Sequence, residues 1–76
     1  MPLVEAAHLR AAATHDRAAE AHDRAAELFD DMGLPSLARD ERARARLDRD
    51  GASVERESAR LRREGIALRS DLAHGT

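Results

Sequence analysis

Apolar and small residues recur every seven positions along almost the whole chain. In residues 1–33 the columns are Val4, Ala11, Ala18, Ala25 and Met32; Ala7, Thr14, Ala21 and Leu28; His8, His15, His22 and Phe29; and Ala12, Ala19 and Ala26. In residues 36–73 they are Leu47, Val54, Leu61 and Leu68; Gly51, Ser58, Gly65 and Leu72; and Ala38, Ala45, Ala52, Ala59, Ile66 and Ala73. A seven-residue period keeps such residues on one face of an α-helix. The pattern therefore predicts an all-α protein built from long helices that pack on other helices.

A cluster of helix-breaking residues from Met32 to Ser36 interrupts the pattern. Gly33 suits the left-handed position after a helix, Pro35 cannot continue a helix, and Ser36 suits the N-cap of a new one. We expect a helix over about residues 3–32, a turn at 33–35 and a helix over about 36–73, within a single domain of residues 1–76. The columns pass Gly51 without a change of phase, so we expect this glycine to bend the second helix at most.

A turn this short makes the two helices neighbours in an antiparallel hairpin. Folding at the turn brings together residues whose numbers add up to about 68. Burial of the largest side chains predicts that their column in the second helix faces the small residues of the first. The predicted hairpin core is Val4, Ala11, Ala18, Ala21, Leu28, Leu47, Gly51, Val54, Leu61, Gly65 and Leu68.

The apolar columns cover more of each helix than one neighbouring helix can bury. The alanine-rich columns that are left over predict a second contact, made with another copy or with a different helical protein. The residues of this predicted interface are Ala12, His15, Ala19, His22, Ala26, Phe29, Ala38, Ala45, Ala52, Ala59 and Ile66. The simplest assembly is a homodimeric four-helix bundle with coiled-coil packing. The predicted function is that of a non-enzymatic oligomerisation or protein–protein interaction module.

Composition narrows the classes of protein to consider. The chain has 76 residues, no cysteine and one aromatic residue, Phe29, so a lone hairpin would have a small core and no disulfide to support it. No apolar run approaches the ~20 residues that span a bilayer, and the N-terminus does not resemble a secretory signal. We therefore expect a cytoplasmic protein without a membrane partner. Residues 1–33 carry a net charge of −4 and residues 34–76 one of +2, which suits helices packed side by side.

The histidine column suggests a weaker alternative, metal or haem binding. Histidine is the commonest metal ligand in proteins. However, His8, His15 and His22 are spaced by two helical turns, about 10.5 Å, and two of them cannot reach one metal ion. Such a site would need histidines from two chains at a dimer seam, so no cofactor is expected in a single chain.

An arginine ridge suggests another alternative, a small nucleic-acid-associated regulator. Arg42, Arg49, Arg56 and Arg63 form one column of the second helix and could contact phosphates. The competing interpretation is a solvated face with salt bridges to nearby acids. The slightly acidic net charge of −2 and the lack of aromatic residues for stacking on bases favour the salt bridges.

Enzymatic function has little support in the sequence. Ser36, Ser53, Ser58 and Ser70 are not placed beside a histidine and an orienting carboxylate in the expected fold.

The stretch from His22 to Ala45 resembles one tetratricopeptide-type hairpin, because Ala26, Phe29, Gly33, Ala38 and Ala45 fall at that family's small, aromatic and glycine positions. The resemblance implies a protein-binding scaffold. Asp50 stands where the family has its terminal proline, and Arg42 where an apolar residue is usual.

Overall fold

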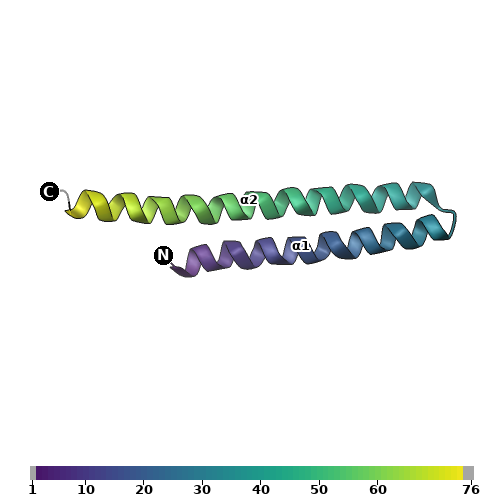
Figure 1. Ribbon diagram of the computed structural model, residues 1–76, viewed down its shortest axis with the longest axis horizontal. Helices are drawn as coiled ribbons and strands as arrows, with labels where there is room; N and C mark the ends of the chain where they lie inside the picture. The colour runs from purple at the N-terminus through teal and green to yellow at the C-terminus, as the bar shows by residue number, and fades with distance from the viewer. Residues whose placement is uncertain (1, 75–76) are drawn as a thin grey trace.

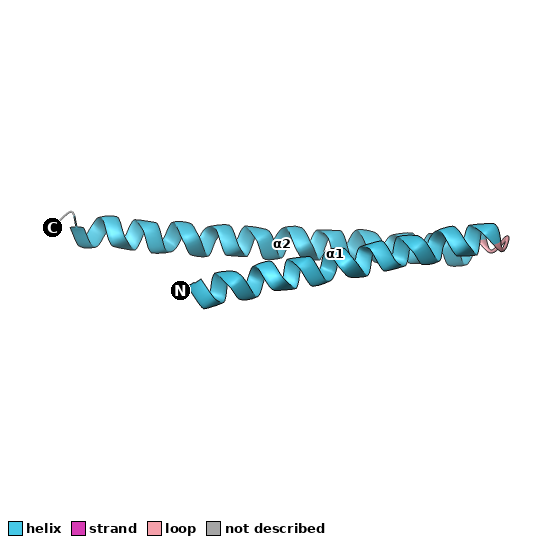
Figure 2. Cartoon of the chain, turned by 60° about the horizontal axis from the view of Figure 1, so that its bottom comes forward, coloured by secondary structure: helices cyan, strands magenta, loops and turns pink. Residues whose placement is uncertain are grey.

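The protein is a hairpin of two long antiparallel helices. The computed structural model describes the backbone of residues 2–74 and the side chains of residues 3–65. Helix α1 spans Pro2–Asp31 and helix α2 spans Pro35–His74. They lie side by side at a shallow angle, and the C-terminal part of α2 extends beyond the start of α1 (Figures 1 and 2). The predicted all-α hairpin is confirmed, and α2 is continuous through Gly51.

The turn between the helices closes α1 with a Schellman motif. Gly33 has a φ of 73°, the left-handed conformation that glycine adopts without steric cost. Its N–H donates to Asp30 O at 3.0 Å, and the N–H of Leu34 donates to Phe29 O at 2.8 Å, so two terminal carbonyl groups of α1 are satisfied. The predicted left-handed glycine is confirmed.

The start of α2 differs from the prediction. Pro35 is the first helical residue instead of part of the turn, and the carbonyl of Leu34 accepts the first helical hydrogen bond, from Ala38 N at 3.1 Å. Ser36 therefore lies inside the helix and is not its N-cap; its hydroxyl accepts from Arg39 Nη2 at 3.2 Å. Proline suits the first helical position for two reasons. Its φ is already helical, and the N–H that it lacks would have no partner within the helix at this position.

The core between the helices consists of alanines. Seven are buried, with at most 3% of their surface exposed: Ala12, Ala19 and Ala26 of α1, and Ala38, Ala45, Ala52 and Ala59 of α2. We call these seven residues the alanine seam. Within residues 3–65 no larger side chain is buried. Small side chains at every seventh position allow the two helix axes to approach closely.

The rotation of the helices differs from the predicted one. Of the predicted hairpin core, Leu28, Leu47, Val54 and Leu61 are 55–70% exposed, and Ala21 is exposed as well. Val4, Ala11, Ala18, Gly51 and Gly65 are half-buried, and the side chain of Leu68 lies outside the described residues. Of the predicted association interface, the alanines form the hairpin seam, His15, His22 and Phe29 are half-buried, and Ile66 lies outside the described side chains. The alanines predicted for association thus form the contact between the two helices, and the leucines predicted for that contact lie at the surface.

The register along the helices agrees with the prediction. On one side of the seam, the paired residues His8–Glu55, His15–Asp48 and His22–Glu41 have numbers that add up to 63. On the other side, Asp16–Arg56, Asp23–Arg49 and Asp30–Arg42 add up to 72. The midpoint, about 68, gives the residues that lie at equal height along the hairpin. Each helix therefore has the expected position along its axis and an unexpected rotation about it.

Candidate interaction surfaces

Histidines and carboxylates form a ladder along one side of the alanine seam, which we call the histidine side. The Nδ1 atom of His8 lies 2.6 Å from Glu55 Oε2, that of His15 2.9 Å from Asp48 Oδ1, and that of His22 2.6 Å from Glu41 Oε2. An ionised carboxylate can only accept, so each ring donates through Nδ1. Every histidine of α1 thus fixes one acidic residue of α2.

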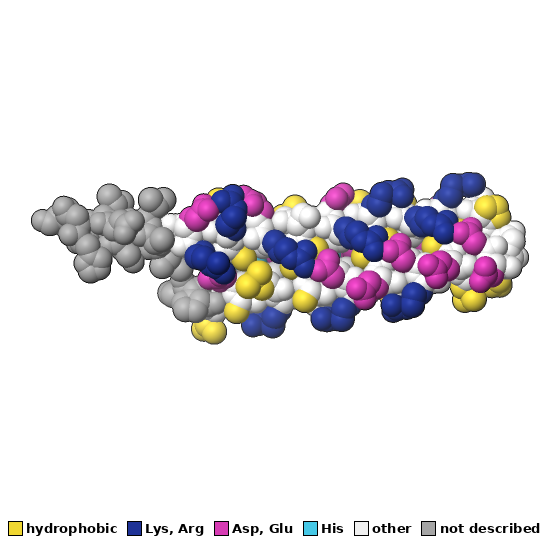
Figure 3. Space-filling model, in the orientation of Figure 1, with side chains coloured by type: hydrophobic (Ala, Val, Ile, Leu, Met, Phe, Trp, Pro, Cys, Tyr) yellow, Lys and Arg dark blue, Asp and Glu magenta, His cyan; other side chains and the backbone are white. Residues whose placement is uncertain are grey.

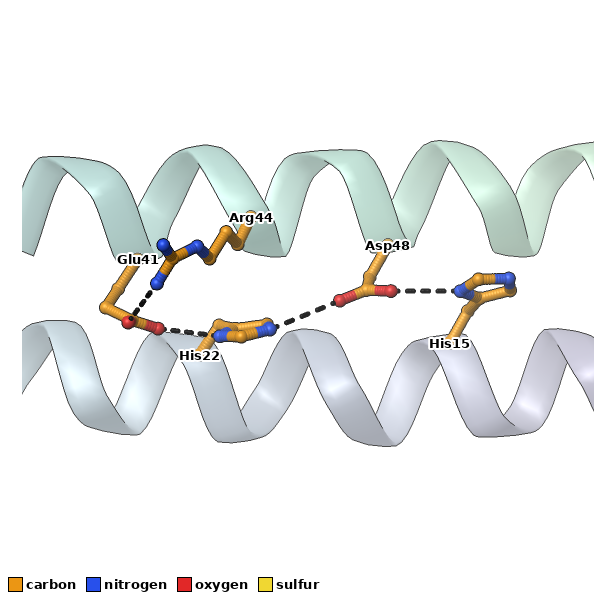
Figure 4. A network of polar contacts seen from close by, with 5 residues as sticks. All are labelled: His15, His22, Glu41, Arg44 and Asp48. Atoms are coloured by element: carbon orange, nitrogen blue, oxygen red, sulfur yellow. Dashed lines mark hydrogen bonds and ion pairs between the residues drawn. The ribbon is translucent and has the colours of Figure 1, made fainter.

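Two steps of the ladder join into a continuous polar network (Figure 4). Asp48 contacts both His15 and His22, since His22 Nε2 lies 3.5 Å from Asp48 Oδ2. Arg44 donates to Glu41 at 2.8 Å and ends the network. The hydrogen bond from His22, helped by the nearby charge of Arg44, holds the pKa of Glu41 below its usual value. The network keeps Glu41 ionised and pairs it within the chain.

Gly51 makes room for one of the rings. A Cβ atom at this position would lie 3.1 Å from Cε1 and Nε2 of His15, closer than ordinary van der Waals contact. Gly51 therefore faces His15. Because the glycine has no side chain, the imidazole can lie against α2 and reach Asp48.

The histidine column does not make a metal site within one chain. Across the part of the chain that the structure describes, no group of three or more histidine, cysteine, aspartate or glutamate side chains could hold a metal ion. The Nδ1 atoms of these three histidines each form a hydrogen bond with a different carboxylate of α2.

Arginines and acids form a second ladder on the opposite side of the seam, the arginine side. Arg42 contacts Asp30 at 2.5 Å, Arg49 contacts Asp23, Arg56 contacts Asp16, and Arg63 Nε donates to Glu5 Oε1 at 2.8 Å. Figure 3 shows rows of arginine and acidic side chains on this face, with no histidine in view. The four arginines that could contact phosphates are all engaged by acids of α1.

The ladder on the arginine side neutralises its own charges. The hydrogen bond from Arg49 lowers the pKa of Asp23, and the same bond raises the pKa of Arg49. Asp30 raises the pKa of Arg42 in the same way. These exposed pairs contribute little stability each. In the observed rotation of the helices, acids and arginines meet along the whole ladder.

The largest exposed apolar column lies on α2. Leu47, Val54 and Leu61, which we call the leucine column, are 70%, 63% and 55% exposed. Each lies two residues after an alanine of the seam, about 200° around the helix. Their neighbours three or four positions away include Gly51 and Ser58, which border the acids of the histidine ladder. The leucine column therefore runs along the outer edge of α2, on the histidine side.

The matching edge of α1 carries small residues. Ala7, Thr14 and Ala21 are exposed at its outer edge on the histidine side. Ala11 and Ala18 lie between that edge and the histidines, and both are half-buried. The outer edge of α2 thus carries a column of large apolar residues, and the outer edge of α1 carries a strip of small residues.

A shallow hollow of about 410 Å³ lies near the open end of the hairpin, lined by His8, Ser58, Leu61, Arg62 and Gly65. The sequence did not place Ser58 near a histidine, yet both side chains line this hollow, and Glu55 holds Nδ1 of His8. No hydrogen bond joins Ser58 to His8. Backbone N–H groups here belong to helices, so they are not available to stabilise an oxyanion.

The acidic partners of the histidines are not among the predicted site residues, although a pattern in the sequence marks them. Glu41, Asp48 and Glu55 repeat every seven residues, as the histidines do, and lie three positions after an alanine of the seam. Two columns of complementary groups with one period on adjacent helices predict a cross-helix ladder.

Comparison of the chain with protein-family models, curated proteins and solved structures gives no match. Among the described residues, neither helix contains a stretch that is long and apolar enough to cross a bilayer.

Proposed function

We propose that this hairpin is a non-enzymatic association module that presents the leucine column to another helical surface. The supporting observation is the reversed distribution of apolar residues, with alanines inside and leucines outside. The simplest assembly that covers this surface is a homodimeric four-helix bundle with coiled-coil packing.

The energies favour association because the internal core is weak. Burying a methyl group contributes about 0.8 kcal/mol, so the seven alanines of the seam contribute roughly 6 kcal/mol together. Burying a leucine or valine contributes about 1.5–3 kcal/mol, so full burial of the three residues of the leucine column would add a similar amount. A partner that covers this column roughly doubles the apolar stabilisation of the hairpin.

The charges near the leucine column limit how a partner can cover it. The histidines and acids of the histidine side are paired within the chain, so covering them leaves no lone charge but costs desolvation. Asp50, Glu57 and Glu64 follow the leucine column at i+3 spacing, so a partner must leave this edge in water or place a basic group against it. On the arginine side, by contrast, exposed charged groups form the surface, which is typical of a face that stays in water (Figure 3).

The nucleic-acid alternative receives no support from the geometry. A phosphate would have to displace acids of α1 from Arg42, Arg49, Arg56 and Arg63. A metal or haem site would require a second chain, because no ligand cluster forms among the described residues. Association through the leucine column remains the function that the surface favours.

Sedimentation equilibrium tests the proposal. The wild-type chain is compared with a variant that carries Leu47→Ser, Val54→Ser and Leu61→Ser, and with the control Leu9→Ser, which replaces an exposed leucine of the arginine side. We expect the wild type and the control to be associated and the triple variant to be monomeric and less helical. A wild-type chain that is monomeric and melts cooperatively as a stable hairpin would rule out the proposed function.

A further inference from the structure

We propose that the hollow near the open end of the hairpin binds the phosphate group of a small organic phosphate, held by Arg62, Ser58 and His8. This inference goes beyond the proposed function, because it concerns a small anionic ligand and not a helical partner. It is supported by the end of the histidine ladder, by a cation without a counterion, and by the donors and size of the hollow.

The acid column of the histidine ladder ends at this hollow. The acids of the ladder repeat every seven residues on α2, and the next position of their column holds Arg62. His22 lies between two of the acids, with Glu41 at Nδ1 and Asp48 near Nε2 (Figure 4). His8 also has an acid at Nδ1, but the next residue of the column is basic. An anion between His8 and Arg62 would take the place that Asp48 has beside His22.

Arg62 has no counterion among the described side chains. It makes no hydrogen bond or ion pair within residues 3–65. The residues three and four positions away along the helix are not acidic: Ser58, Ala59, Gly65 and Ile66. The adjacent Arg63, by contrast, is paired with Glu5. A guanidinium group binds a phosphate through two parallel N–H groups, so Arg62 is suited to such a ligand.

The hollow brings two further donors to the same place. Ser58 lies one helical turn before Arg62, and its hydroxyl has no hydrogen-bond partner within residues 3–65. Glu55 occupies Nδ1 of His8, which leaves Nε2 for a ligand, and an anion beside the ring favours the doubly protonated form in which Nε2 donates. The tetrahedral oxygens of a phosphate can accept from three directions, whereas those of a carboxylate lie in one plane.

The size of the hollow favours an organic phosphate over the bare ion. Its volume of about 410 Å³ falls in the range of small-molecule sites, about 300–1,000 Å³. Gly65 lines it without a side chain that would fill it, and Leu61 provides an apolar wall. An organic group attached to the phosphate would lie against Leu61.

Titrations of the full chain, followed by ¹H–¹⁵N NMR at constant ionic strength, test the site. Inorganic phosphate and phenyl phosphate are the two probes. The variants Arg62→Gln and Ser58→Ala each remove one donor. The matched control is Arg46→Gln, which removes an exposed arginine of the same helix that does not line the hollow. Circular dichroism compares the helix content of all four chains.

We expect saturable shifts around residues 58–65 and at His8, with tighter binding of phenyl phosphate than of inorganic phosphate. Loss of a hydrogen bond to a charged group should weaken binding about ten-fold or more in Arg62→Gln, and less in Ser58→Ala. Arg46→Gln should bind as the wild type does. Shifts that do not saturate, or equal weakening by Arg46→Gln and Arg62→Gln, would show a general attraction of anions to arginines and overturn the inference. Neither result bears on the proposed function, which sedimentation tests separately.

Discussion

A leucine placed in the alanine seam should destabilise the hairpin, because the seam has no room for it. Ala45 is 1% exposed and lies between the two helices. Ala45→Leu adds three carbon atoms at this contact, and overpacking of this kind costs about 1–3 kcal/mol. The helices would have to separate, which also strains the flanking pairs that hold Asp48 and Arg49. Leucine and alanine both favour helices, so propensity does not explain a loss.

The matched control is Ala43→Leu, a substitution two residues earlier, on the outer edge of α2. Urea and thermal unfolding, followed by circular dichroism at one fixed protein concentration, measure both variants. A change of about 1 kcal/mol shifts the Tm of a chain this size by roughly 4–8 °C, so Ala45→Leu should lower the Tm by at least about 4 °C. The control should change it by less. If leucine at position 45 raised the Tm, the alanine seam would not be the inner contact.

Two further predictions concern the ladders. The first is a double-mutant cycle of Gly51→Ala and His15→Ala. In the His15→Ala variant, Gly51→Ala should stabilise the fold by about 1 kcal/mol through helix propensity. In the wild type the gain should be clearly smaller because the new Cβ of residue 51 meets the His15 ring, and equal gains would contradict this packing. Acid should weaken the hairpin: the pKa values of Asp23 and Glu41 lie below their usual 3.8 and 4.5 in the fold, so the stability they contribute is present above about pH 4.5 and is lost as the pH falls through the lowered values. Urea midpoints at pH 7 and pH 3 measure the loss, which should shrink in Asp23→Asn; identical midpoints for the wild type would refute it.

The sequence was sufficient to predict the elements of the fold. A seven-residue period specifies which residues share a helix face, and Gly33 with Pro35 specifies where the chain turns. The same features predict which residues lie at equal height, because the length of the turn determines the register. Each of these properties depends on local geometry, which the order of residues contains directly.

The rotation of each helix about its own axis depends on which of its faces packs against the other helix. The seven-residue period places residues on faces but does not specify which face is the inner one. The prediction ranked the faces by the size of their side chains, which favoured Leu47 and Val54 as inner residues. The observed rotation instead matches the charged columns of the two helices. With alanines inside, Asp23 meets Arg49 on one flank while His15 meets Asp48 on the other, and both matches repeat every seven residues. Charge columns with the same period as the apolar columns were the signal for the correct rotation.

The reversed rotation also changes how the large residues are explained. In a hairpin that must be stable alone, placing Leu47, Val54 and Leu61 outside forfeits most of the apolar area available to the chain. In a hairpin that associates with a partner, the same residues would be buried by that partner. The alanine seam and its two ladders fix the distance and register between the helices, and so the positions of these residues.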